Sequence, residues 1–176
     1  AAWQKSAFRD GLTGSYNRKF LKEHKKKLIP QALRDKFNIG VLLLDMDHFK
    51  AVNDEYGHDI GDKVLKELAR ILNETIRESD IIIRYGGEEF IVLLVNIKTE
   101  EQAISVANKI RIKVSENEID VYAGSKLRKT VSIGLSMFPE DSSSLESVIK
   151  NADIALYEAK TKGRNQVVRF QSEQTS

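Results

Sequence analysis

Acidic residues stand at two places where strands are expected to end. The apolar run 38–47 finishes with Asp45 and Asp47, and Glu88 comes directly after the glycine pair 86–87. Close carboxylates repel one another unless a cation lies between them, and Mg²⁺ is commonly held by one or two carboxylates together with the phosphates of a substrate. The pattern therefore predicts a magnesium site for a triphosphate. Taken singly, each residue has a structural alternative, in which the aspartates cap a strand and Glu88 is simply hydrated at a turn.

A polar, glycine-containing segment, residues 48–62, follows the acidic end of the first run. Asn53 offers hydrogen-bond donors and an acceptor, and Asp62 offers two acceptor oxygens, which together suit the N1, amine and O6 edge of guanine. Asp62 can instead be the N-cap of a following helix, and a cap can also hold a ligand. The segment is thus typical of a binding loop for a guanine nucleotide.

Two β-rich runs, 81–84 and 89–95, flank the glycine pair and predict a hairpin. Paired glycines favour this interpretation because they readily supply the positive φ angles of a tight turn. The run 38–47 is typical of a central strand buried on both faces. If that strand lies beside the hairpin, Asp45 meets Glu88.

Hydrophobic periodicity predicts the remaining elements in the order β-α-β-β-α-β. This order is that of a ferredoxin-like α+β fold, an antiparallel sheet with helices on one face, here extended by a further helix and strand. In addition to the three strands already described, the sequence predicts three helices and two strands. They are a helix at about 62–77, a helix marked by 103–114, a half-buried strand at 131–137, a helix from 142–144 to Gly163, and a closing strand at 167–170.

The composition fits one domain, because 176 residues of which 41% are hydrophobic suffice for one core. A formal charge of +2 predicts neither a nucleic-acid partner nor membrane contact by this segment. The absence of cysteine excludes disulfides and is compatible with the cytoplasm. The start at Ala1 indicates a piece of a longer protein. We expect the domain over 10–170, the end of a linker helix over 1–9 and a disordered tail over 171–176.

The segment from Asp45 to Asp62 resembles, without a gap, the signature D-x-D-x-F-K-x-x-N-D-x-x-G-H-x-x-G-D of the GGDEF domain family. The run 84–90, Arg-Tyr-Gly-Gly-Glu-Glu-Phe, is similar to the motif that names the family, in its GGEEF variant. Further similar blocks stand in the family's order at 10–18, 130–134 and 152–165. The resemblance covers about residues 10–170.

The resemblance implies a palm of the nucleotidyl cyclase type and the activity of a diguanylate cyclase, which condenses two GTP into cyclic di-GMP with release of pyrophosphate. It implies Mg²⁺, with Mn²⁺ as an alternative ion. Because each half-site holds one GTP and the product needs two bonds, it also implies a homodimer. An upstream sensor or transmembrane domain is expected in the full-length protein, with this segment in the cytoplasm.

The resemblance also assigns roles to individual residues. Glu88 is either the base or a metal ligand, and Lys160 and Arg164 have an alternative role at a helix C-terminus. The implied metal ligands are Asp45, the backbone carbonyl of Met46 and Glu88; the catalytic groups Glu88, Lys50 and Asp45; the guanine contacts Asn53 and Asp62; the phosphate contacts Lys50, Lys160 and Arg164; and the bare backbone beside the nucleotide Gly86 and Gly87.

Arg77 and Asp80 match the family's R-x-x-D motif, which implies an inhibitory site for the product, with Lys109 as a second basic residue. The alternative is a local ion pair near a helix end. Two other functions stay open. One is a catalytically silent module that only binds GTP or cyclic di-GMP, and the other is a different palm-like nucleotidyl transferase, which would not need the pair Asn53 and Asp62.

Overall fold

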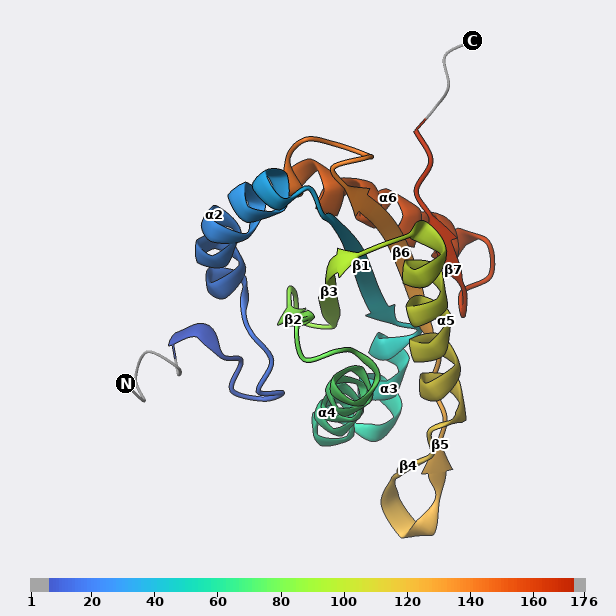
Figure 1. Ribbon diagram of the computed structural model, residues 1–176. Coiled ribbons are helices and arrows are strands. Elements are labelled where there is room, and N and C mark those ends of the chain that lie inside the picture. Colours follow the sequence, from blue (N-terminus) through green and yellow to red (C-terminus); the bar gives the residue numbers. More distant parts are fainter. Residues whose placement is uncertain (1–6, 173–176) are drawn as a thin grey trace.

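A five-stranded sheet forms the centre of the molecule, and helices cover both of its faces (Figure 1). The structure, a computed structural model, describes residues 7–172. The linker helix expected over 1–9 and the tail expected over 171–176 fall largely outside this range. None of the helices between residues 7 and 172 contains an apolar stretch that could span a bilayer.

The strands lie in the order β2-β3-β1-β6-β7. All neighbouring pairs are antiparallel except β6 and β7, which are parallel. The expected antiparallel sheet is confirmed for β2, β3, β1 and β6, and the additional C-terminal strand makes the whole sheet mixed. The reason is the connection through a helix, which returns the chain to the end of the sheet where β6 began. The bounds are β1 (Asn38–Met46), β2 (Ile81–Arg84), β3 (Glu89–Ile97), β6 (Val131–Phe138) and β7 (Val167–Arg169).

The helices form one layer on each face of this sheet. Leu42 and Leu44 of β1 pack with α4 and α5, whereas Val41 and Leu43 pack with α2 and α6. The two helices of the expected β-α-β-β-α-β unit, α4 and α5, therefore share one face as predicted, and the helix before β1 and the added C-terminal helix cover the second face. The bounds are α2 (Arg18–Asp35), α3 (Phe49–Tyr56), α4 (His58–Thr75), α5 (Glu100–Glu116) and α6 (Leu145–Thr161).

A small hairpin follows α5 and extends away from the body of the domain (Figure 1). It consists of β4 (Ile119–Asp120) and β5 (Lys126–Leu127), joined by the 3-10 turn η1 (Tyr122–Gly124). The expected β-α-β-β-α-β order with its additional helix and strand is confirmed around this insertion.

The segment 48–62 is helical rather than a loop. Gly57, with φ of +88°, separates α3 from α4, and its N–H still bonds to the carbonyl of Asn53 at 2.9 Å. Because α4 already begins at His58, Asp62 lies inside this helix and is not its N-cap. The short, polar sequence of α3 carries too few apolar residues to show helical periodicity, which explains why it was expected to be irregular.

Strand β6 is buried on both faces, although its alternating sequence predicts a half-buried strand. The hydroxyls of Ser132 and Ser136 donate to buried or half-buried carboxylates. Between them, Gly134 lets α6 approach, since a Cβ at this position would stand 2.1 Å from the carbonyl oxygen of Ala152 and 2.4 Å from the N of Leu156. Small residues on this face thus bring helix α6 close to the sheet.

Replacing Gly134 by alanine is expected to destabilise the domain by about 1–3 kcal/mol, because the atoms it would meet are helix backbone and cannot rotate away. The measurement is chemical denaturation of the parent and the variant. Gly11→Ala is the matched control, since no atom lies within 4 Å of its Cβ position, and it should stay within about 0.5 kcal/mol of the parent. Equal losses in the two variants would contradict this account of the packing of α6.

Candidate active site

The structure brings Asp45 and Glu88 together, as the sequence predicts. Asp45 of β1 is paired in register with Glu89, the first residue of β3, and Glu88 immediately precedes that strand. The side chain of Asp45 is only 9% exposed, and its Oδ2 accepts from the Nζ of Lys160. Its Oδ1 is buried and has no hydrogen-bond partner among the described residues. A buried carboxylate oxygen without a partner is costly, and a bound cation would satisfy it.

Negative charges accumulate around this oxygen. Burial raises the pKa of Asp45, against the opposing effect of Lys160. Burial and then the charge of Asp45 raise the pKa of Glu88. The same two causes, in the same order, raise the pKa of Glu89. Three carboxyl groups that are each harder to ionise than usual favour a positive ligand at this end of the sheet.

The donor set suits an ion that also takes oxygens from a substrate. Within residues 7–172 no cluster of three or more histidine, aspartate or glutamate side chains forms a complete metal site. Two carboxylates, Asp45 and Glu88, would leave most coordination positions to backbone oxygen, water and phosphate, which is the usual arrangement for Mg²⁺. Glu89 received no role in the sequence analysis, although the register of the hairpin with the first strand would have placed it opposite Asp45.

The glycine turn leaves room at this position. Neither Gly86 nor Gly87 adopts a positive φ, so that expectation is wrong. The turn closes through N–H groups of Tyr85 and Gly86, which both donate to the carbonyl of Glu89, at 2.8 and 3.2 Å. Nothing lies within 4 Å of the place where a Cβ of Gly87 would stand. Gly87 therefore provides open space beside Glu88, and the backbone conformation requires neither glycine.

Two arginines hold this turn from outside. Arg18 donates to the carbonyl of Tyr85 at 2.5 Å, and its guanidinium lies 3.8 Å above the tyrosine ring. Arg84 donates to the carbonyl of Gly87 at 2.7 Å and pairs with Asp10 at 3.1 Å. Residues before β1 thus support both sides of the turn, Arg18 directly and Asp10 through Arg84. Both arginines stand in blocks that resemble the family, but their residue types alone indicate no role.

A cleft of about 450 Å³ opens beside the turn, which is within the usual size range of ligand sites. It contains the predicted nucleotide contacts Lys50, Asn53, Asp62 and Gly87 and the predicted metal ligand Glu88. The other predicted contacts, Gly86, Lys160 and Arg164, are not among its lining residues. It also contains residues that the sequence analysis missed, Phe49, His58, Leu65 and Arg84. His58, Asp62 and Leu65 lie on one face of α4 at helical spacing. A helix predicted from residue 58 instead of 62 would have placed His58 and Leu65 beside Asp62.

Asp47 belongs to the support of the site and not to its open surface. It is 2% exposed, and its two oxygens accept from the hydroxyls of Thr130 and Ser132, each at 2.6 Å. It also accepts the N–H of Asn165 at 3.0 Å, which holds the segment after α6 against the end of β1. Asp47 therefore has the structural role that the sequence offered as an alternative, at the end of the strand. Arg164, just before this anchor, has a φ of +63°, and its charge acts on Asp45.

Arg77 and Asp80 form an ion pair at 2.8 Å, as their local alternative predicts. Asp80 also accepts the backbone N–H groups of Arg77 and Val95 at 2.9 and 3.1 Å. These two residues nevertheless line a hollow of about 420 Å³, and the basic residue that joins them there is Arg9. Lys109 is exposed on α5 and is not among the residues lining this hollow.

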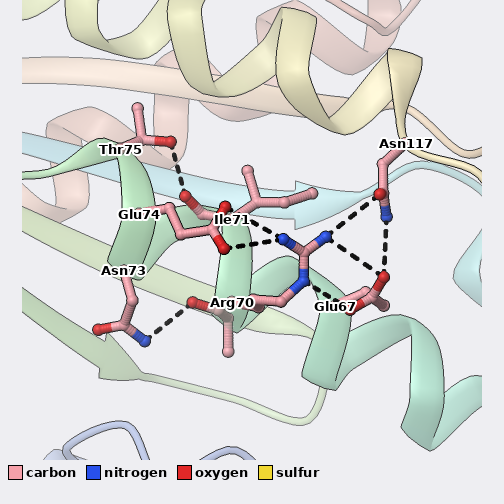
Figure 2. A network of polar contacts seen from close by, with 8 residues as sticks. Glu67, Arg70, Ile71, Asn73, Glu74, Thr75 and Asn117 are labelled. Carbon is pink, nitrogen blue, oxygen red and sulfur yellow. Dashed lines mark hydrogen bonds and ion pairs between the residues drawn. The ribbon is translucent and has the colours of Figure 1, made fainter.

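Helix α4, which carries Asp62, is tied to the end of α5 by a surface network (Figure 2). Arg70 pairs with Glu67 at 2.8 Å and with Glu74 at 3.0 Å, and it donates to the side chain of Asn117 at 3.2 Å. Asn117 in turn donates to Glu67 at 3.2 Å. Each exposed pair adds little stability by itself, but the bonds to Asn117 fix the two helices relative to one another.

Glu88→Gln should make the domain more stable at neutral pH. A carboxyl with a raised pKa in the folded state favours folding when protonated, and this contribution is lost as the pH rises through that pKa. Removing the charge should therefore raise the Tm at pH 7.5 by roughly 1–3 °C. The increase is small because Glu88 is partly exposed and water screens its charge.

The same variant should show little difference from the parent near pH 4, where the parent carboxyl is itself largely protonated. Glu55→Gln on the exposed side of α3 is the control and should leave the Tm unchanged at both pH values. Thermal scans at the two pH values give the answer, and a lower Tm for Glu88→Gln at neutral pH would exclude the proposed charge repulsion.

The mixed sheet, its acidic strand end and the facing glycine turn define the palm class of nucleotidyl cyclases. The family model described as "Diguanylate cyclase, GGDEF domain" matches residues 7–166. The chain belongs to this family, and the resemblance found in the sequence is confirmed.

Two relatives show the extent of the similarity. The chain is 46% identical over 132 residues to "Diguanylate cyclase A" of Treponema denticola, which covers 75% of this chain and 35% of that protein. It is 39% identical over 163 residues to "Response regulator PleD" of Caulobacter vibrioides, covering 92% of this chain and 36% of that protein. The chain therefore spans about a third of the length of these curated relatives.

Solved structures agree with the fold. The GGDEF domain of PA1120 from Pseudomonas aeruginosa superposes with a TM-score of 0.88 at 31% identity, covering 93% of this chain and 94% of that one. The GGDEF domain of DgcB from Caulobacter crescentus, solved in complex with c-di-GMP, gives 0.86 at 32% identity, with 94% of each chain covered.

Proposed function

We propose that this domain condenses two molecules of GTP into cyclic di-GMP and releases pyrophosphate. The observation that carries the proposal is the buried oxygen of Asp45 that has no hydrogen-bond partner among the described residues. The charge of Asp45 acts on Glu88, which lines a cleft together with amide, carboxylate and ammonium groups. A metal-bound triphosphate would satisfy that oxygen. Membership of the family and the named diguanylate cyclase among the relatives support the same activity.

The cleft residues divide into two groups by chemistry. Asn53 and Asp62 would read the hydrogen-bonding edge of guanine, with the apolar side chains of Phe49 and Leu65 beside them. Lys50, Lys160 and Arg164 would approach the phosphates, where cationic groups stabilise the charge that moves onto the leaving pyrophosphate. Gly86 and Gly87 would let the nucleotide lie against bare backbone.

Asp45, Glu88 and the backbone carbonyl of Met46 would hold Mg²⁺, and Mn²⁺ would suit the same oxygens. The ion would supply positive charge to the phosphate oxygens. In each bond-forming step the 3′-hydroxyl of one GTP attacks the α-phosphorus of the other, and the hydroxyl proton must leave. Glu88, whose raised pKa suits a proton acceptor, either takes this proton or only keeps the ion in place.

The product contains two such bonds, and one domain offers one nucleotide cleft. Two protomers would therefore face one another around a two-fold axis, each presenting its GTP to the other. This homodimer would form in the cytoplasm, where GTP is available, under control of an upstream sensor or transmembrane domain in the full-length protein. The part of the relatives that this chain does not span leaves room for such domains.

The activity is tested by incubating the dimeric protein with GTP or ATP plus Mg²⁺ or Mn²⁺ and separating the products by chromatography. The parent should make cyclic di-GMP from GTP only. Asp45→Asn and Glu88→Gln should lower the rate by about 100-fold or more, because each removes one carboxylate from the ion. Glu55→Gln should be as active as the parent.

A second readout does not depend on turnover. Mg²⁺ with GTP should raise the Tm of the parent, and Asp45→Asn should lose this increase. Binding of GTP without any product from the dimer would favour the silent receptor, and a product from ATP would favour another nucleotidyl transferase. Either result would overturn the proposed activity.

We further propose that the hollow beside Arg77 binds the product and lowers activity. Arg77 is 51% exposed and can turn from Asp80 toward a phosphate or the Hoogsteen edge of guanine. Arg9 lines the same hollow and adds a second positive charge. A family structure solved in complex with c-di-GMP supports product binding by such domains.

Arg77→Ala should weaken binding of cyclic di-GMP at least 10-fold in titration calorimetry and relieve product inhibition. Asp80 is a poor target, because its removal would leave two backbone N–H groups without their acceptor. Arg34→Ala, at an exposed arginine of α2, is the control, and Lys109→Ala tests the sequence-based assignment of that residue. Unchanged affinity in Arg77→Ala would place the product elsewhere.

A further inference from the structure

Gly61 is a buried glycine in the interior of helix α4. Its φ lies outside the left-handed region, so no turn and no backbone strain requires glycine here. Alanine is the better residue in a helix interior, since glycine loses more conformational freedom on folding. The reason for glycine at this position must therefore be the atoms that surround it.

That space is filled by side chains of α3. A Cβ on Gly61 would stand 1.9 Å from Oδ1 and 3.0 Å from Cγ of Asn53, and 3.4 Å from Cζ of Phe49. The carbonyl of Asn53 accepts the N–H of Gly57 at 2.9 Å, which fixes the backbone at the end of α3. With its backbone held, Asn53 can respond to an added methyl group only by turning its amide away.

We propose that Gly61 is a positioning residue for nucleobase selection. Because Gly61 has no Cβ, the side-chain amide of Asn53 can occupy the space above it. Asp62 is the next residue of α4. This inference rests on the proposed function, in which these two side chains read guanine. Recognition of a base edge through a few hydrogen bonds depends strongly on their geometry, because a misplaced partner leaves buried polar groups unpaired.

The nature of the obstructing atoms separates this role from a packing role. At Gly61 the nearest atom is the end of one short side chain, whereas at Gly134 it is helix backbone. Gly61→Ala should therefore keep a Tm within about 2 °C of the parent, because the amide can rotate and alanine favours the helix. Gly134→Ala, the matched control, should lose stability but keep base selection.

The first experiment measures competition of GTP, ITP and ATP for the nucleotide cleft of the dimeric protein in the presence of Mg²⁺. ITP lacks the exocyclic amine of guanine. The preference for GTP over ITP should fall at least 10-fold in Gly61→Ala and in Asn53→Ala, and it should stay within 2-fold of the parent in Gly134→Ala. An unchanged preference in Gly61→Ala would overturn the proposal.

The second experiment combines the two substitutions. If Gly61 acts through Asn53, then Gly61→Ala should change the preference by less than 2-fold in the Asn53→Ala background, where the obstructed atoms are gone. Independent effects that multiply in the double variant would overturn the proposal.

The third experiment needs no nucleotide and follows the side-chain amide signals of Asn53 by NMR. They should shift strongly in Gly61→Ala and stay in place in Gly134→Ala. Unchanged signals in Gly61→Ala would show that the amide of Asn53 does not lie against Gly61. If the parent binds no GTP, the proposed function fails and the selection role fails with it, while shifted amide signals would still establish the contact between Gly61 and Asn53.

Discussion

One carboxylate, Asp45, is buried at the end of an otherwise apolar strand, and the groups around it determine what this end of the sheet can bind. Its strand lies between two helical layers, so the carboxylate is removed from water as its apolar neighbours are. One oxygen bonds to Lys160 and the other has no partner among the described residues. Glu88 and Glu89 add negative charge instead of neutralising it. Such an arrangement costs stability in the free protein and is suited to binding a cation with its anionic substrate.

Several elements exist in their observed form because of this arrangement. Lys160 reaches Asp45 only because α6 lies close to β6, which the small residue Gly134 permits. On the other side, the turn before Glu88 is fixed by arginines from β2 and from the start of α2. The backbone of Tyr16 also bonds to Arg84 at 2.8 Å, so the segment before β1 is added along the edge of the hairpin.

Much of this fold could be predicted from short-range patterns. The apolar run of β1, the hairpin around the glycine pair and the periodic faces of α4, α5 and α6 each depend on local sequence, and they place Asp45 opposite the turn. The start of α4 could not be predicted, because α3 is short and polar and Gly57 ends it without a proline or an apolar break. The burial of β6 on both faces could not be predicted either. Ser132 is polar because it donates to Asp47, and Gly134 is small because α6 approaches it, and neither contact is visible in the local sequence. Roles such as that of Gly61 depend on contacts between helices and have no local signal.

We propose that the end of β1 and the glycine turn form one site for a divalent cation and a guanine nucleotide. The most direct measurement is a crystal structure of the domain with a non-hydrolysable GTP analogue and Mn²⁺, located by its anomalous scattering. We predict a Mn²⁺ peak bonded to both Asp45 and Glu88, with the triphosphate near Lys160 and the base between Asn53 and Asp62. A nucleotide bound elsewhere, or an ion that contacts neither carboxylate, would contradict the claim.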